Sequence, residues 1–135
     1  MLPQNYKPTA KEKFMNPQQQ EYFRRKLLAW RDDLLRESSE TLESLQQENL
    51  AQPDLTDRAS METDRAIELR TRDRERKLIS KIDAALQRIA TGEYGYCEET
   101  GEPISLKRLD ARPIATLSLE AQERHERQER TRRDD

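Results

Sequence analysis

The sequence predicts a mainly α-helical protein: a long antiparallel two-helix coiled-coil arm and a small globular region, in which a zinc-finger-like knuckle, expected to be metal-free, precedes a C-terminal helix. Apolar residues recur three and four positions apart over 17–50 and again over 55–90, which is the periodicity of one helix face. Charged residues make up 39% of the chain and apolar residues 33%, so each helix has only a narrow apolar stripe. The 3 Gly all lie between 92 and 101, where the helical pattern stops.

Three parts follow from this pattern. Residues 1–17 are expected to form an N-terminal segment that packs on the globular region. Residues 18–91 should form the coiled-coil hairpin, with its tip at 51–59. Residues 92–135 should form the knuckle and the C-terminal helix, with turn-rich sequence over 94–115.

The helix boundaries have local causes. The first helix should run over 17–50, because Pro53 disfavours helical geometry in the residue before it. The second should run over 55–90 and end where Gly92 can adopt the left-handed conformation of a helix cap. A last helix is expected over 118–133.

Apolar side chains on one face of each long helix should hold the hairpin together. They are Phe23, Leu27, Trp30, Leu34, Leu35, Leu42 and Leu45 in the first helix, and Ala66, Leu69, Ile79, Ile82, Leu86 and Ile89 in the second. Residues 70–77 contain no apolar side chain, so core packing alone cannot hold this segment. It is either a weak point of the hairpin or a surface for a partner.

Composition narrows the class of protein. The 25 basic residues nearly balance the 27 acidic ones, which argues against a free-standing nucleic-acid-binding module. Apolar runs are too short for a transmembrane helix, and the N-terminus lacks the apolar segment of a signal peptide. With 1 Cys there is no intramolecular disulfide. We therefore expect a cytoplasmic protein that does not associate with membranes.

The tip of the arm carries two carboxylates, Asp54 and Asp57. They can cap the second helix by accepting hydrogen bonds from its free N–H groups. They can also act on a partner, because a protein that needs only stability gains nothing from placing them at the end of an arm roughly 50 Å long. Likewise, the basic residues of 70–81 are either a solvated helix face or a surface for carboxylates or phosphates.

Cys97 raises the question of a metal. Cys97, Thr100, Ser118 and Ala121 have the C-x2-C-x17-C-x2-C spacing of a four-cysteine zinc site. Hydroxyl groups and a methyl group cannot complete a tetrahedral structural zinc site, so we expect no metal here. Instead, Cys97 should be a small buried side chain.

Catalysis by Cys97 is not expected. The single His, His125, lies in the charged terminal helix, and neighbouring Glu side chains should raise the pKa of the thiol. We predict no catalytic residues and no enzymatic activity.

Four stretches resemble one family: "FRRKLLAWRDDL", "PDLTDRAS", "ELRTRDRERKLISKI" and "GEYGYCEETGEPISLKRLDARPIATLSLEAQ". Together they are similar to the DksA/TraR family of bacterial RNA polymerase-binding transcription factors, over nearly the whole chain. The resemblance implies a monomer that binds polymerase rather than specific DNA and inserts its arm through the secondary channel. Its tip motif falls on Asp54, Asp57 and Ala59. The implied outcome is destabilised open complexes, with repression of ribosomal-RNA-type promoters and activation of some biosynthetic ones.

The resemblance also implies contacts farther along the second helix. Arg70 and Arg74 match positions that contact the polymerase rim. Leu78, Lys81 and Arg112 match positions that bind guanosine tetraphosphate, the effector of the stringent response. A further basic position of that pocket corresponds here to the neutral Gln122.

The largest departure from the family is the zinc site. Without a tetrathiolate, the knuckle should keep its fold through local hydrogen bonds and a small apolar cluster. Its predicted members are Ile104, Leu106, Leu109, Ile114, Leu117 and Leu119. The competing interpretation is a structural coiled-coil adaptor that does not bind polymerase.

Overall fold

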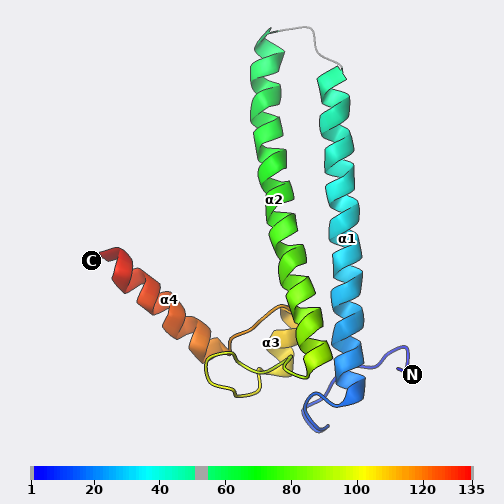
Figure 1. The fold of residues 1–135 in the computed structure, drawn as a ribbon, viewed down its shortest axis with the longest axis vertical. Helices are drawn as coiled ribbons and strands as arrows, with labels where there is room; N and C mark the ends of the chain where they lie inside the picture. Colours follow the sequence, from blue (N-terminus) through cyan, green and yellow to red (C-terminus); the bar gives the residue numbers. More distant parts are fainter. Residues whose placement is uncertain (1, 51–54, 135) are drawn as a thin grey trace. The chain divides into compact units, whose positions relative to one another are not determined.

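The computed structural model describes residues 2–50 and 55–134, with only the backbone described at 41, 44–50, 55–59 and 133–134. Figure 1 shows its helices, which are α1 (Pro17–Leu50), α2 (Leu55–Thr91), α3 (Leu106–Ala111) and α4 (Leu119–Asp134). The only extended pairing among the described residues is an isolated bridge between Tyr96 and Pro103. The mainly helical fold class is confirmed, as are the bounds of α1, α2 and α4 to within a residue, whereas α3 was not predicted. In the described part of the chain, no helix is long and apolar enough to span a bilayer.

The chain divides into two compact units. The first combines Met1–Leu27 with Ala84–Asp135, and the second is Leu28–Asp83. The second unit lies entirely within the predicted hairpin. The first unit contains the remaining parts of both long helices, 17–27 and 84–91, together with the N-terminal segment and everything that follows α2.

In the second unit, α1 and α2 run antiparallel (Figure 1). Leu34 and Ile82 are buried, and an ion pair of 2.7 Å joins Arg31 to Asp83. The prediction of a buried stripe is wrong for Leu35, Leu42 and Leu69, which are 43%, 37% and 44% exposed. A pair of helices buries only one narrow seam, so apolar side chains beside that seam remain in contact with water.

Glu75 is an unexpected buried residue of the second unit. It lies in the segment 70–77 that lacks apolar side chains, yet it is only 7% exposed, and its Oε2 has no hydrogen-bond partner among the described residues. A carboxylate thus occupies a position that the heptad pattern of a coiled coil reserves for an apolar side chain. This part of α2 is held without apolar packing of its own.

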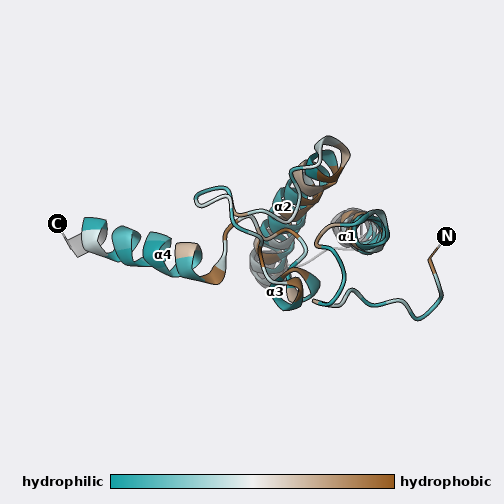
Figure 2. Ribbon diagram, turned by 90° about the horizontal axis from the view of Figure 1, so that it is seen from below, coloured by the Kyte–Doolittle hydropathy of each residue, from teal (hydrophilic) through white to brown (hydrophobic). Residues whose placement is uncertain are grey.

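The first unit has a small core. Phe23, Leu27, Tyr94, Ile104 and Leu109 are at most 3% exposed, and the rings of Phe23 and Tyr94 lie 5.6 Å apart. Of the predicted apolar cluster, Ile104, Leu109 and Ile114 are buried, and Leu106 and Leu117 are half-buried. Leu119 is 55% exposed, which contradicts the prediction. It is the first residue of α4, which Figure 2 shows to be mostly hydrophilic, and the buried apolar residue of the described part of this helix is the small Ala121.

The N-terminal segment contacts the turn that follows α2. Gly95 has a φ of 92°, and a Cβ placed there would lie 3.0 Å from Met15 Cε and 3.1 Å from Phe14 Cζ. The rings of Phe14 and Tyr96 meet edge to face at 5.3 Å. The fully buried Gln19 fixes the start of α1, because its side-chain oxygen accepts a hydrogen bond of 2.8 Å from the Met15 N–H.

Candidate functional site

The knuckle begins where α2 ends. Gly92 has a φ of 82°, and its N–H donates to the carbonyl of Ile89, as expected of a helix C-cap. The following chain turns around Cys97: its N–H donates to Glu102 O at 2.8 Å, and its carbonyl accepts from the Gly101 N–H at 2.9 Å. Backbone hydrogen bonds therefore close the turn that carries the thiol.

Cys97 is buried, as predicted, with 3% of its surface exposed. Burial is the largest single effect on the thiol and raises its pKa. Hydrogen bonds to the sulfur from the Thr100 hydroxyl and from the backbone N–H groups of Ser118, Thr100 and Glu99 together outweigh burial and lower the pKa to about 6. The expectation that neighbouring carboxylates raise this pKa is therefore wrong, because four donors converge on the sulfur.

The three other positions with zinc-ligand spacing have structural partners of their own. The Ser118 hydroxyl accepts from the Ala121 N–H at 3.2 Å and caps α4. The Thr100 hydroxyl accepts from the Glu102 N–H at 3.2 Å, and Ala121 is fully buried. One thiol, two hydroxyls and a methyl group do not fit a tetrahedral zinc ion. Within the described ranges, no group of three or more His, Cys, Asp or Glu is placed to hold a metal.

Two side chains tie the knuckle to its surroundings in the first unit. Arg88, near the end of α2, forms an ion pair with Glu98 and donates to the backbone carbonyls of Glu93 and Tyr96 at 3.2 Å and 2.9 Å. The buried Tyr94 hydroxyl donates to the carbonyl of Pro113 at 2.8 Å. Sequence reasoning missed both ties, although an Arg one turn before a capping Gly is a recognisable signal.

The predicted tip residues can be located only in part. Asp54 lies outside the described residues. Asp57 and Ala59 lie in the first turns of α2, where the structure describes the backbone alone.

The predicted rim residues lie on the surface of α2. Arg70 and Arg74 are one turn apart and exposed, and with Ile67 and Thr71 they line a hollow of about 220 Å³. The side chain of Ile67 is 53% exposed. Two guanidinium groups beside an exposed apolar side chain form a surface suited to a protein partner that carries carboxylates.

The predicted nucleotide residues come from both units. Leu78 is half-buried and Lys81 is exposed, both on α2 in the second unit. Arg112 is exposed in the first unit. It is the C-cap residue of α3, and its backbone N–H donates to the carbonyl of Arg108 at 2.8 Å. Among the described residues, neither Lys81 nor Arg112 forms an ion pair. Gln122 is half-buried, and its amide donates to Glu126.

Comparison with known proteins gives two family matches. Residues 19–89 match the model described as "DnaK suppressor protein DksA, N-terminal domain", and residues 92–127 match the "Prokaryotic dksA/traR C4-type zinc finger". The second description implies four cysteines, whereas this chain has 1. The match at the knuckle therefore rests on features other than its metal ligands.

Individual relatives agree with the family models. The chain is 66% identical over 131 residues to the RNA polymerase-binding transcription factor DksA of Caulobacter vibrioides (strain NA1000 / CB15N), covering 97% of this chain and 92% of the relative. It is 44% identical to the protein of the same name from Escherichia coli (strain K12), covering 85% and 76%. The solved structure of transcription factor DksA2 from Pseudomonas aeruginosa matches with a TM-score of 0.83 and 45% identity, covering 91% of this chain and 93% of that one.

Proposed function

This chain belongs to the DksA/TraR family, and on that premise we propose that it is an RNA polymerase-binding transcription factor without enzymatic activity of its own. The observation that carries the proposal is the 66% identity, over 97% of the chain, to a protein of that name. The proposal is also supported by Arg70 and Arg74, which are exposed on α2 and can bind carboxylates of a protein partner.

In the proposed mechanism the hairpin enters the polymerase through its secondary channel. Helices of 34 and 37 residues are each roughly 50 Å long, and this length supports the proposed entry into the secondary channel. Asp54, Asp57 and Ala59 would then lie near the catalytic magnesium, for which carboxylate oxygens are suitable ligands. The consequence is destabilised open complexes, which represses ribosomal-RNA-type promoters and favours some biosynthetic ones.

Guanosine tetraphosphate is the proposed effector. Lys81 and Arg112 are exposed cations without an ion-pair partner in the described chain, so their charge is available to phosphates. Leu78 is the third residue of the proposed site. Gln122 supplies no charge at the further basic position of the family, so the response to the nucleotide should be weaker than in members with a cation there.

In vitro transcription tests the tip. Wild-type protein is added to polymerase on a ribosomal-RNA-type promoter and compared with Asp54→Asn/Asp57→Asn. A matched control, Glu62→Gln/Asp64→Asn, removes two exposed charges from α2 outside the tip. We expect wild type and control to inhibit, and the tip variant to bind polymerase without inhibiting. If wild type neither binds nor inhibits, the proposal fails and a structural coiled-coil adaptor remains.

The effector is tested in the same assay by titrating guanosine tetraphosphate. Lys81→Gln and Arg112→Gln should weaken the nucleotide response while leaving inhibition without nucleotide intact. Lys77→Gln removes an exposed cation from the same helix and should behave as wild type. An unchanged response in both site variants would remove these residues from the effector site.

A further inference from the structure

The outer hairpin, which we define as residues 35–43 of α1 and 60–78 of α2, has no buried apolar side chain where its side chains are described. Its exposed large apolar residues are Leu35, Leu42, Ile67 and Leu69. Three other apolar residues are only half-buried: Met61, Ala66 and Leu78. The buried side chain of the described outer hairpin is instead a carboxylate, Glu75, which is 7% exposed. The two helices therefore gain little here from the burial of apolar surface that usually holds a coiled coil together.

Glu75 is buried without a partner for its charge. It forms no ion pair with a described residue, and its Oε2 has no hydrogen-bond partner there. The α1 stretch of the outer hairpin contains a single basic residue, Arg36, whose guanidinium is bonded to Asp33. Glu68, one heptad before Glu75, is half-buried and its Oε2 also lacks a described partner. Closing the outer hairpin thus takes carboxylate oxygens out of water without pairing them, which is unfavourable.

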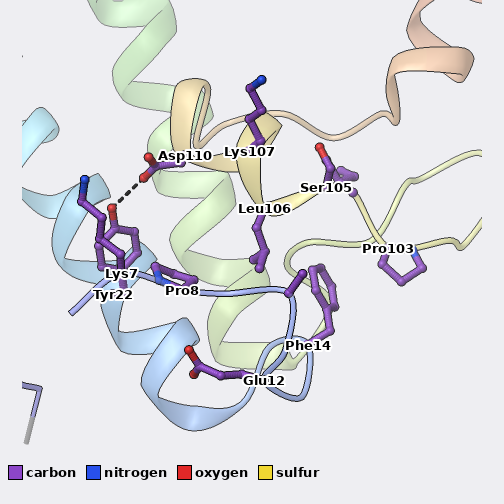
Figure 3. Close-up of a pocket in the computed structure, with 12 residues that line it drawn as sticks. Lys7, Pro8, Glu12, Phe14, Tyr22, Pro103, Ser105, Leu106, Lys107 and Asp110 are labelled. Carbon is purple, nitrogen blue, oxygen red and sulfur yellow. Dashed lines mark hydrogen bonds between the residues drawn. The ribbon is translucent and has the colours of Figure 1, made fainter.

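The remaining parts of α1 and α2 are held by different contacts. Leu34 and Ile82 are buried apolar residues directly beyond the outer hairpin. In the first unit, α1 is also tied by a polar contact, since Figure 3 shows the Tyr22 hydroxyl bonded to Asp110 of α3, at 2.6 Å. The buried position of α2 therefore changes from apolar to charged within one heptad, between Ile82 and Glu75.

We propose that Glu75 makes the outer hairpin a separately opening element, whose two helices come apart and re-form while the seam at Leu34 and Ile82 stays closed. Opening returns the carboxylate to water and exposes little apolar surface, so it requires little free energy. Helices that have separated are only marginally stable in water and fray. Opening at Ile82 requires more free energy, because it exposes a fully buried apolar side chain.

The arm then has two parts with different functions. The apolar seam keeps the hairpin intact, and the outer hairpin changes between closed and open states. A partner that contacts both helices of the outer hairpin would favour its closed state by mass action. The opening itself is a property of the free chain, so it can be measured without polymerase or promoter, and its failure would leave the proposed transcriptional function untouched.

The test is hydrogen exchange of the full chain, resolved to single amides by nuclear magnetic resonance. In the wild type, amides of the outer hairpin should have protection factors at least about tenfold lower than those around Leu34 and Ile82. Glu75→Leu places an apolar side chain in the seam and should raise protection in the outer hairpin about tenfold or more, with the amides around Ile82 unchanged. Glu75→Gln removes the charge at nearly constant size and should raise protection by a smaller factor.

The amides of 35–43 distinguish closing of the hairpin from stiffening of one helix. A substitution that only improves the helix propensity of α2 protects α2 alone, whereas closing the hairpin protects both helices. Asp73→Leu is the matched control, because it removes an exposed acid two residues from Glu75 and introduces the same side chain outside the seam. It should leave the protection of 35–43 as in the wild type.

Four results would overturn the proposal. The first is a wild-type outer hairpin as well protected as the amides around Ile82. The second is a Glu75→Leu protein in which 35–43 keeps its wild-type exchange, and the third is a Glu75→Leu protein protected no more than Asp73→Leu. The fourth is protection that appears only at raised protein concentration, which would indicate self-association. If Glu75→Leu aggregates, Glu75→Gln decides, since unchanged or faster exchange in 35–43 of that variant contradicts the proposal.

Discussion

Replacing the half-buried Arg88 with Met should destabilise the first unit, because its guanidinium holds three oxygen atoms of the knuckle. The Arg88 side chain is 17% exposed, and the substitution removes the hydrogen bonds of its guanidinium to the Glu98 carboxylate and to the carbonyls of Glu93 and Tyr96. Hydrogen bonds from a charged donor contribute about 1.5–3 kcal/mol each. Water can reach part of the vacated turn, so we expect a net loss of about 2–4 kcal/mol in the free energy of unfolding.

Urea unfolding followed by circular dichroism measures this loss, and Glu98→Gln is the matched control. The Glu98 side chain is 58% exposed, so breaking the ion pair alone should cost less than about 1 kcal/mol. Arg88→Lys keeps the charge but loses the multiple N–H donors of the guanidinium, so its loss of free energy of unfolding should lie between those of Arg88→Met and Glu98→Gln. If Arg88→Met stays within about 0.5 kcal/mol of wild type, or costs no more than Glu98→Gln, the two carbonyl bonds do not hold the knuckle.

Three further predictions concern the same unit. Tyr94→Phe leaves the Pro113 carbonyl without its buried donor and should lower the free energy of unfolding by about 1–3 kcal/mol; an unchanged urea midpoint would contradict this. The Cys97 thiol should show a thiolate absorbance with a midpoint near pH 6. That pKa lies below the unfolded value of about 8.5, so the thiolate stabilises the folded protein fully above the unfolded pKa, and this stabilisation is lost as the pH falls through about 6. The difference in the free energy of unfolding between wild type and Cys97→Ser should therefore shrink on acidification. A midpoint near the unfolded value would refute the four-donor account. Finally, protein purified from zinc-replete cells should contain far less than one zinc per chain, and a chelator should leave its melting temperature unchanged; stoichiometric zinc would show that the knuckle binds metal after all.

Much of the fold could be predicted because its signals are local. The apolar period of α1 and α2, Pro53 between them and Gly92 after them depend on neighbouring residues alone. The short helix α3 was missed because six residues give too little periodicity to detect, although Ser105 caps it through its hydroxyl. Burial was predicted less well: Leu69 and Glu75 both lie on α2, yet the Leu is exposed and the Glu is buried. That outcome depends on how the two helices face each other, which the period of one helix does not fix.

The candidate site divides in the same way. Which residues replace zinc ligands could be read from spacing, because ligand spacing is a property of the chain. The contacts that hold the knuckle without a metal could not be read from spacing. They pair Tyr94 with Pro113 and Lys26 with Asp110, which lie far apart in sequence. The low pKa of Cys97 was missed for a similar reason: one of its four hydrogen-bond donors is the backbone of Ser118.

The exposure of α4 bears on timescales of motion. From 123 to 132 every side chain is exposed, so nothing beyond Gln122 in this described stretch anchors the helix to the core. An isolated helix of this length is marginal in water. Its amide protons should therefore exchange with solvent at rates set by fraying, whereas those around the fully buried Leu109 should exchange only when the first unit unfolds. Hydrogen exchange would thus divide the first unit into a slowly exchanging core and a rapidly exchanging C-terminal end. A partner that immobilised α4 would reduce this difference in exchange rate.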